Sequence, residues 1–409
     1  MRTSKLFTKT SKNTPADEVS RNAQLLIRAG YVYKEMAGVY AYLPLGLRVI
    51  ENIKKIVREE MNAVDGQELI MTNLQDKATW EKTDRWDERN VDVWFKTALQ
   101  DGTELGLAWS HEEPILKMTQ QYVSSYRDLP MSMYQFQVKM RNELRAKSGV
   151  MRGREFIMKD MYSLHASQED CDEYYERVKQ AYVKIFDRLG LGNDTFVTFA
   201  SGGAFTKFSH EFQTICEAGE DWLYVDRGQG IGVNEEVLED AVSELGLDRE
   251  KLEKVRSAEV GNIFNFGNTK AEEMGVTYKS EANEDVPAYL ASYGVGVNRV
   301  MGVIVEKFAD DKGIVWPEAV APFRASLIGI GEGITAADEL YAGREESLLY
   351  DDRDVRPGEK FADAELMGMP YRVVISDKSL AAGGAELTVR ATGESKIVAI
   401  EEIVGALDI

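Results

Sequence analysis

Four side chains within residues 134–165 have the types and the spacing needed to bind a polyphosphate. Arg141 and Glu143 stand two residues apart in a strand-like run, and Phe156 follows Arg152 by four residues. Residues two apart on a strand share a face, so a hairpin through this segment would bring the four side chains onto one surface. The segment is basic in a chain whose formal net charge is −20, and this local inversion of charge favours an anionic ligand.

This combination of side chains suits ATP in particular. Arginine guanidinium groups bind phosphate oxygens through paired hydrogen bonds, the Glu143 carboxylate can accept from an exocyclic amino group, and the Phe156 ring can stack on a purine. The alternative is a solvated basic hairpin with Phe156 in the core. The particular spacing of the two arginine-containing pairs favours the ATP site.

The order Arg-x-Glu, loop, Arg-x-x-x-Phe resembles motif 2 of the class II aminoacyl-tRNA synthetases, and the run REFIMKDMYS within it resembles the prolyl-tRNA synthetases. Residues 38–61 resemble motif 1, whose helix and strand form the dimer interface of that class. Residues 292–317 resemble motif 3. In this last segment Gly294 and Gly296 allow a close backbone approach, and Arg299 would lie in the first turn of a helix, where the resemblance implies that it reaches the γ-phosphate.

The elements around these motifs predict an α/β (α+β) protein with two domains. The resemblance implies a class II catalytic domain over residues 1–320, built on an antiparallel sheet with flanking helices. Prolines bracket residues 317–322, and the chain beyond them alternates strands and helices, which is typical of a small α/β domain. Residues 321–409 resemble the anticodon-binding domain of the same family.

Hydrophobic periodicity predicts several helices in the first domain. We expect a helix from Asp17 to Ala37 that is interrupted near Gly30, then a long amphipathic helix through motif 1. A third helix should begin near Cys171 and end at Gly190 or Gly192. Residues 234–257 are charged and predict a helical stretch.

The run Ser110-His111-Glu112-Glu113 is the candidate for amino-acid recognition. It resembles the loop with which prolyl-tRNA synthetases hold proline, and a carboxylate at Glu112 would accept a charge-assisted hydrogen bond from the secondary ammonium. A helix N-cap at Ser110 is an equally good interpretation of the residues alone. The resemblance further implies proline contacts by Arg141, by His210 in a SHEF segment and by Ser292.

Threonyl-tRNA synthetases are the nearest alternative, but they hold the substrate on a zinc ion bound by one cysteine and two histidines. The two cysteines and three histidines of this chain form no such pattern, so we expect no zinc. A non-catalytic synthetase paralogue that binds tRNA or regulates another protein is a second alternative, and a ligase that activates another small acid is a third. Retention of Arg141, Glu143, Arg152, Phe156 and Arg299 favours an enzyme over the paralogue.

The resemblance implies a two-step reaction in which proline and ATP form prolyl-adenylate, and the adenylate then transfers proline to the 3′ end of tRNA(Pro). Arg141, Arg152 and Arg299 would stabilise the phosphates together with Mg²⁺, whose protein ligands the sequence does not identify. Only 127 positions separate His165 from Ser292 (292 − 165), so we expect no editing domain between motifs 2 and 3.

The acidic balance argues against indiscriminate binding of nucleic acid, because such binding requires a basic surface. A tRNA partner must then contact local basic patches. The exposed cations expected at Arg353, Arg356 and Lys360 are our candidates for the anticodon, although a solvated run of charges is an equally good interpretation. No apolar run reaches membrane length, and the two cysteines suit a reducing compartment, so we expect a cytoplasmic protein. The resemblance to motif 1 further implies a homodimer.

Overall fold

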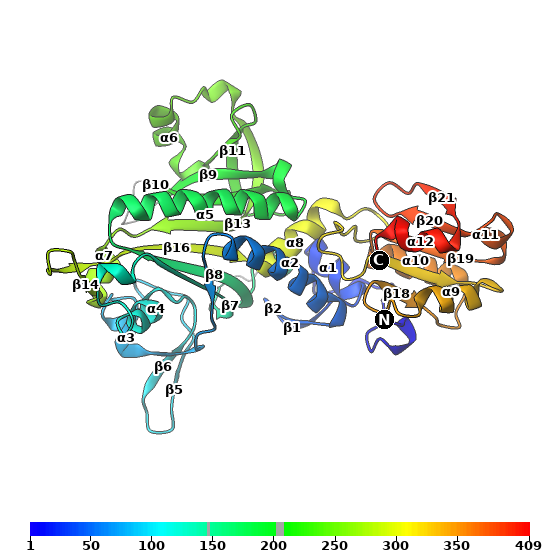
Figure 1. The fold of residues 1–409 in the computed structure, drawn as a ribbon, viewed down its shortest axis with the longest axis horizontal. Helices are drawn as coiled ribbons and strands as arrows, with labels where there is room; N and C mark the ends of the chain where they lie inside the picture. Colours follow the sequence, from blue (N-terminus) through cyan, green and yellow to red (C-terminus); the bar gives the residue numbers. More distant parts are fainter. Residues whose placement is uncertain (145–147, 202–207) are drawn as a thin grey trace. The chain divides into compact units, whose positions relative to one another are not determined.

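The computed structural model describes residues 1–144, 148–201 and 208–409, and its ribbon is drawn in Figure 1. Its contacts divide the chain into two units. Unit 1 comprises residues 1–35, 40–53 and 304–409, whereas unit 2 comprises residues 36–39 and 54–303. The domain boundary that the sequence predicts near residue 320 stays a prediction.

Unit 2 is built on a nine-stranded sheet with the order β10-β9-β12-β11-β13-β16-β8-β7-β3. Neighbouring strands are antiparallel except in the pairs β12–β9 and β3–β7. The antiparallel catalytic sheet expected from the sequence is therefore confirmed. The strands are β3 (Gln67–Glu68), β7 (Met131–Met140), β8 (Glu155–His165), β9 (Thr195–Ser201), β10 (Phe208–Ile215), β11 (Asp221–Asp226), β12 (Ile231–Asn234), β13 (Glu253–Asn265) and β16 (Tyr289–Gly296).

The predicted hairpin of motif 2 is formed by β7 and β8. The two strands pair along their whole lengths, from Met131 opposite Leu164 to Met140 opposite Glu155. On sequence grounds, residues 145–149 between these strands are also a possible tRNA contact, but positions 145–147 lie outside the described residues. The same holds for residues 205–207, an insertion that lengthens the loop before the SHEF segment.

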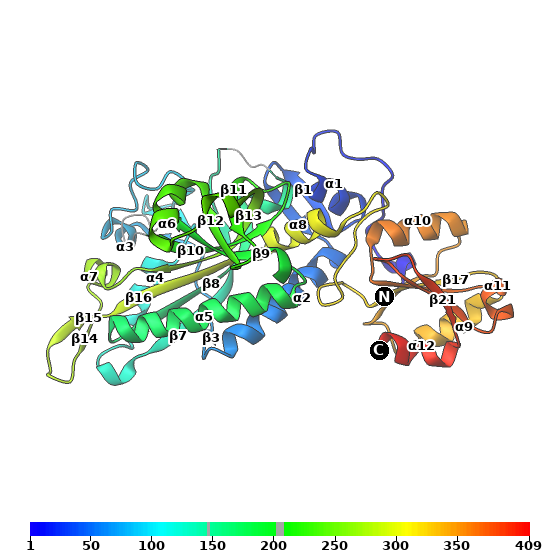
Figure 2. The same cartoon turned by 90° about the horizontal axis from the view of Figure 1, so that it is seen from above.

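The side chains of β8 point alternately to two faces of the sheet, one covered by a helix and the other open. On one face, Lys159 donates to the hydroxyl of Tyr182 in helix α5 (Gln168–Arg188) at 2.5 Å. On the other face, Phe156, Met158 and Asp160 line a cavity. This period of two follows from strand geometry. Figure 2 shows α5 lying along the strands from a second direction.

The strands β9 to β13 close on themselves, because β10 pairs with both β9 and β13. Two small sheets, β4-β6-β5 and β14-β15, lie outside the main sheet. The smaller elements of unit 2 are β4 (Leu74–Asp76), α3 (Lys77–Glu81), β5 (Lys96–Ala98), β6 (Glu104–Leu107), α4 (Glu112–Thr119), α6 (Leu238–Leu245), α7 (Thr269–Met274), β14 (Thr277–Lys279) and β15 (Asp285–Pro287).

The C-terminal part of unit 1 contains a five-stranded sheet with the order β18-β17-β19-β20-β21. Successive residues of its strands face opposite layers: Leu327 and Val373 pack with one cluster, whereas Ile328 and Val374 pack with another. The predicted small α/β domain is confirmed. Its elements are β17 (Ala325–Gly329), α9 (Gly333–Tyr341), β18 (Leu348–Asp351), α10 (Pro357–Met367), β19 (Tyr371–Ile375), α11 (Asp377–Ala381), β20 (Ala385–Val389), β21 (Ser395–Val398) and α12 (Ile400–Leu407).

Two helix predictions were wrong in part. The first helix, α1, covers only Arg21–Arg28, and the chain turns at Gly30 with a φ of 75° before the hairpin of β1 (Val32–Met36) and β2 (Val39–Tyr42). In residues 234–257, α6 ends at Gly246 and strand β13 begins at residue 253. The long helix of motif 1, α2 (Pro44–Asn62), and the helix of motif 3, α8 (Val297–Phe308), occur where the sequence predicts them.

Candidate active site

A cavity of about 400 Å³ lies on the face of the nine-stranded sheet that α5 does not cover. This volume is within the usual range for small-molecule sites. The cavity is lined by eight of the nine residues that the sequence predicts for ATP, proline and catalysis, namely Ser110, Glu112, Arg141, Glu143, Arg152, Phe156, Ser292 and Arg299. Motifs that lie far apart in the sequence thus contribute side chains to a single cavity.

Strand register sets the floor of the cavity. Gly294 on β16 lies between Asp160 on β8 and Asn262 on β13. A Cβ at Gly294 would stand 3.0 Å from the amide oxygen of Asn262, so glycine keeps this part of the floor open. In the next row Ser292 is flanked by Tyr162.

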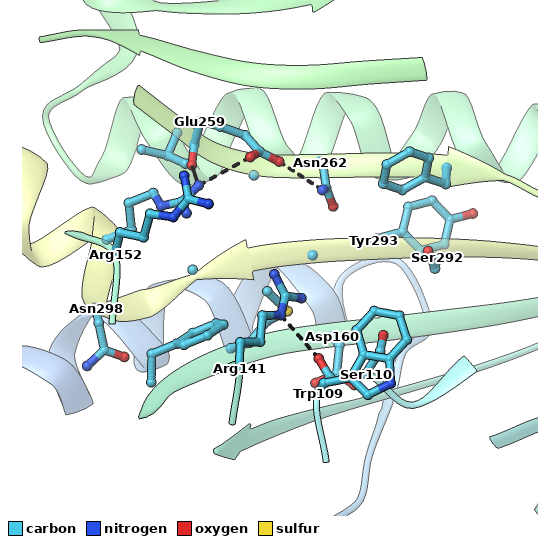
Figure 3. Close-up of a pocket in the computed structure, with 18 of the residues that line it drawn as sticks. Trp109, Ser110, Arg141, Arg152, Asp160, Glu259, Asn262, Ser292, Tyr293 and Asn298 are labelled. Atoms are coloured by element: carbon cyan, nitrogen blue, oxygen red, sulfur yellow. Dashed lines mark hydrogen bonds and ion pairs between the residues drawn. The ribbon is translucent and has the colours of Figure 1, made fainter. Parts of the chain in front are cut away.

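Arg141 follows the last residue of β7 and lies between the two ends of the cavity. Figure 3 shows it between Arg152 on one side and Ser110 on the other. Its Nε donates to the carbonyl oxygen of Trp109 at 3.3 Å. Burial lowers the pKa of Arg141, and the nearby positive charge of Arg299 lowers it further. Both effects disfavour the bare cation, so an anion bound beside Arg141 would be stabilised.

Arg152 pairs with two carboxylates. Its Nη2 lies 2.9 Å from Oε2 of Glu143, and its Nη1 lies 2.5 Å from Oε2 of Glu220. The side chain predicted to accept from adenine, Glu143, therefore also orients an arginine predicted to bind phosphate.

Arg299 occupies the first turn of α8 and is held by backbone and side-chain acceptors. Its Nε donates to the carbonyl oxygen of Met151 at 2.9 Å, and its Nη1 donates to that of Glu259 at 2.7 Å. Nη1 also lies 3.2 Å from the Glu259 carboxylate, to which Asn262 donates at 2.8 Å. These bonds fix the guanidinium at the cavity wall.

Glu259 lines the cavity, and its carboxylate is shared between Arg299 and Asn262. Burial raises the pKa of nearby Glu211 to about 8, and the negative charge of Glu259 contributes to the same shift. A cation beside the two carboxylates would relieve this repulsion. Within residues 1–144, 148–201 and 208–409, no group of three or more His, Cys, Asp or Glu side chains is placed to hold a metal ion.

The opposite end of the cavity carries Ser110 and Glu112. The hydroxyl of Ser110 donates to Oε2 of Glu112, which stands in the first turn of α4. The N-cap of this helix is His111, not Ser110, so the capping alternative for Ser110 is wrong. Burial alone would raise the pKa of Glu112, but the charges of Arg85 and Lys139 and the hydrogen bond from Ser110 together hold it below its ordinary value.

Of the nine predicted residues, His210 is the one that the structure does not place at the cavity lining. It lies on β10, where its Nδ1 is 2.9 Å from the hydroxyl of Tyr175 and its ring packs on Phe199. Burial lowers the pKa of His210 to about 4. The structure thus places the His210 ring against Tyr175 and Phe199, outside the cavity lining, and the proline contact stays a prediction.

Comparisons with known proteins show which families the chain resembles. Residues 94–308 match the family model "tRNA synthetase class II core domain (G, H, P, S and T)", and residues 335–408 match "Anticodon binding domain". The chain is 36% identical to the proline–tRNA ligase of Wolbachia pipientis wMel, covering 99% of both chains. It is also 36% identical to that of Gluconobacter oxydans, covering 98% of both.

The chain belongs to the family of the proline–tRNA ligases. The family predicted from the motifs is therefore confirmed. The fold also resembles two solved prolyl-tRNA synthetases. That of Cryptosporidium parvum with halofuginone and AMPPNP has a TM-score of 0.77 at 16% identity, covering 95% of this chain and 76% of that one. That of Giardia lamblia with prolyl-adenylate has a TM-score of 0.76 at 19% identity, covering 94% and 77%.

Several side chains at this proline–tRNA ligase site were not predicted. Glu259 stands in the EVGNIF segment that resembles the family, and its carboxylate is the signal that could have identified it. Arg85 lies in a tryptophan-rich segment, residues 80–94, and Asp160 lies in the REFIMKDMYS run; both line the cavity. Their roles depend on neighbours far away in the sequence.

The three anticodon candidates differ in their surroundings. Lys360 is only 7% exposed, and its ammonium donates to the carbonyl oxygen of Asp351 at 3.0 Å. Arg353 pairs with the carboxylates of Asp351 and Asp363 at 2.6 and 2.7 Å. The expectation that both are exposed cations is therefore wrong. Arg356, at the N-cap of α10, is exposed.

Proposed function

We propose that this chain activates proline with ATP to form prolyl-adenylate and then transfers proline to the 3′ end of tRNA(Pro). The observation that carries the proposal is the composition of the one cavity: guanidinium groups at Arg152 and Arg299, a third at Arg141 in the middle, and the Ser110–Glu112 pair at the far end. Along the cavity, these groups match first the phosphates of ATP, then the reacting atoms, and finally the ammonium group of proline.

ATP would lie along the arginine end of the cavity. Arg152 and Arg299 would bind the terminal phosphates, and Arg141 would bind the α-phosphate, because guanidinium groups match phosphate oxygens. Glu143 would accept from the exocyclic amino group of adenine. Phe156, whose ring already lies 5.3 Å from the Arg141 guanidinium carbon, would stack on the purine.

Proline would lie between Arg141 and the Ser110–Glu112 pair. Its secondary ammonium would donate to the Glu112 carboxylate, and its carboxylate would lie beside Arg141. Ser292, which is 7% exposed at the cavity floor, would contact the ring.

Catalysis in this arrangement rests on position and charge. The carboxylate of proline attacks the α-phosphate, pyrophosphate leaves toward Arg152 and Arg299, and the terminal ribose hydroxyl of tRNA then attacks the adenylate carbonyl. No side-chain nucleophile is needed. The guanidinium groups are already in place, so little reorganisation accompanies the developing charge.

Mg²⁺ would be held by the phosphates and the Glu259 carboxylate, with Glu211 close by. Magnesium commonly binds through one or two carboxylates plus substrate phosphates, and this donor set fits that pattern. When bound, the ion would neutralise phosphate charge. The proposal assigns no role to zinc.

We also propose a cytoplasmic homodimer that joins through motif 1 and binds the anticodon through residues 321–409. Strand β3 is the edge of the nine-stranded sheet, and the neighbouring Ile70 and Leu74 are 77% and 55% exposed, which supports an interface there. Sedimentation equilibrium tests the dimer. No helix in the described part of the chain is both long and apolar enough to cross a membrane.

Proline-dependent exchange of pyrophosphate into ATP, measured against a panel of amino acids, tests the activity. Wild type should prefer proline, and Arg141→Ala and Arg299→Ala should each abolish exchange while circular dichroism stays unchanged. Near-normal exchange in either variant would remove that arginine from the site. Charging of tRNA with another amino acid, or no exchange with any of them, would overturn the proposed function.

A further inference from the structure

Arg85 connects Glu112, the proposed acceptor for the proline ammonium, to a buried anchor. Its Nη1 lies 2.8 and 3.0 Å from the two carboxylate oxygens of Glu113, and 3.5 Å from Oε2 of Glu112. The Glu113 side chain is fully buried, whereas that of Glu112 is 12% exposed. One guanidinium nitrogen therefore bridges a fixed carboxylate and one that lines the cavity.

Aromatic rings hold the Arg85 guanidinium in this position. Its carbon lies 4.4 Å from the Trp109 ring centre and 5.3 Å from that of Trp80. Trp94 packs on both rings and donates from its indole nitrogen to the carbonyl oxygen of Arg85 at 2.8 Å. Cation–π contacts of this kind favour a partly desolvated cation, so the tryptophan-rich segment forms a rigid clamp around one arginine.

Two neighbouring side chains hold the Glu112 carboxylate through the same oxygen. Both Ser110 and Arg85 contact Oε2. The carboxylate also accepts from its own backbone N–H, and it lines the cavity, where a ligand can reach it. A carboxylate held through one oxygen presents the other in a defined direction.

We propose that Arg85 is a positioning residue for proline recognition, which fixes the Glu112 carboxylate by direct contact and keeps it turned toward the cavity. This inference rests on the proposed function, because it assumes that Glu112 accepts from the proline ammonium. Arg85 itself need not touch the substrate. The anchor on Glu113 and the clamp on Trp109 allow it to act through Glu112.

The charged and titratable groups facing Glu112 come from several elements. Lys139 and Arg141 are the other cations, and Tyr162 and His111 are neutral neighbours. Burial lowers the pKa of His111 to about 4 and raises the pKa of Tyr162 well above its ordinary value. Neither ring titrates between about pH 5.5 and 8.5 on this basis. Proline affinity can therefore be measured across this pH range in wild type and in an Arg85 variant. A difference between their pH profiles then reports on Glu112.

The test compares Arg85→Met and Arg85→Lys with Arg89→Ala in pyrophosphate exchange, varying proline and ATP separately across that pH range. Arg89 is the matched control, because it belongs to the same segment, its side chain is 87% exposed and its partner is Asp87. Arg85→Met should raise the KM for proline about tenfold or more near pH 7, with kcat and the KM for ATP within about threefold of wild type.

The pH dependence separates positioning from a merely structural role. Without the cation, the pKa of Glu112 should rise, so in Arg85→Met the loss of proline affinity on acidification should begin at higher pH. Arg85→Lys should restore much of the wild-type profile, and Arg89→Ala should match wild type. Equal changes in kcat and in both KM values, or an unmoved acid limb, would overturn the inference.

The controls distinguish a failure of the proposed function from a failure of the role of Arg85. If wild type shows no proline-dependent exchange, the proposed function fails. If wild type is active and Arg85→Met behaves as Arg89→Ala does, only the role of Arg85 fails. Should Arg85→Met not fold, as judged by circular dichroism, Arg85→Lys carries the test: it should raise the KM for proline more than the KM for ATP, and an unchanged ratio would refute the role.

Discussion

Nη1 of Arg152 lies 2.5 Å from Oε2 of Glu220, so an arginine proposed to bind ATP phosphate is already paired with a carboxylate. Glu220 stands in the turn between β10 and β11, outside the three motifs. Phosphate oxygens and the Glu220 carboxylate would compete for the same guanidinium. ATP binding therefore includes the loss of one ion pair.

Replacing Glu220 with glutamine should strengthen ATP binding modestly. The side chains of Arg152 and Glu220 are 39% and 34% exposed, and an ion pair of this exposure contributes about 0.2–1 kcal/mol. The KM for ATP should then fall by no more than about fivefold, with the KM for proline unchanged. Pyrophosphate exchange measures both, and Glu217→Gln in the same turn is the control. An increase in the KM for ATP would instead indicate that Glu220 helps to hold the nucleotide.

The pair Glu211 and Glu259 predicts a pH-dependent stability. Burial, together with the charge of Glu259, raises the folded-state pKa of Glu211 well above its ordinary value, to about 8. A raised folded-state pKa contributes stability below the unfolded-state value, and this contribution is lost as the pH rises through about 8. Glu211→Gln should therefore raise Tm little near pH 5 and most above pH 8. Thermal unfolding without nucleotide tests this, and a pH-independent difference would contradict it.

The predicted hairpin and its resemblance to motif 2 were sufficient to place Arg141, Glu143 and Phe156 at one site, and the resemblance to motif 3 added Arg299. The period of two was not the reason for Arg141 and Glu143, because β7 ends at Met140 and both residues lie beyond the strand. Arg85 could not be found in this way, because its partner Glu112 is 27 residues away and no periodicity connects a turn to the first turn of a helix. The hairpin after Gly30 was missed because its apolar residues follow directly on a helical pattern.

The burial of individual side chains could also not be predicted from the local sequence pattern. Lys360 belongs to a charged run that is typical of a solvated surface, yet its ammonium is enclosed and bonded to backbone carbonyl oxygens. His210 was included through a sequence word, but the strand places its ring against Tyr175. In both cases the side chain's environment is set by elements distant in the sequence.

Lys139 should be essential for the stability of unit 2. Its ammonium is buried, 2.8 Å from Oδ2 of Asp160 and 2.5 Å from Nδ1 of His111. The charge of Lys139 holds the pKa of Asp160 below its ordinary value despite burial. Lys139→Met would leave the Asp160 carboxylate buried without a cation, which costs about 3–5 kcal/mol.

Urea unfolding followed by tryptophan fluorescence measures this loss, because Trp80 and Trp94 lie in the same unit. The double variant Lys139→Met/Asp160→Asn is the control. It should recover part of the lost stability, since no unpaired charge remains. Equal midpoints for the single and double variants would show that the ion pair is not the cause.

Arg356 is the anticodon candidate that the structure leaves exposed, at the N-cap of α10. Arg356→Ala should raise the KM for tRNA about five- to tenfold in charging assays and leave proline-dependent pyrophosphate exchange unchanged, because the reaction at the cavity does not require the anticodon. Lys378→Ala, which removes another exposed cation of the same domain, should affect neither activity. Lys360→Met should instead lower Tm, because the bond to the carbonyl oxygen of Asp351 is lost. Equal loss of charging and exchange in Arg356→Ala would indicate damage to the fold and would remove Arg356 from the tRNA surface.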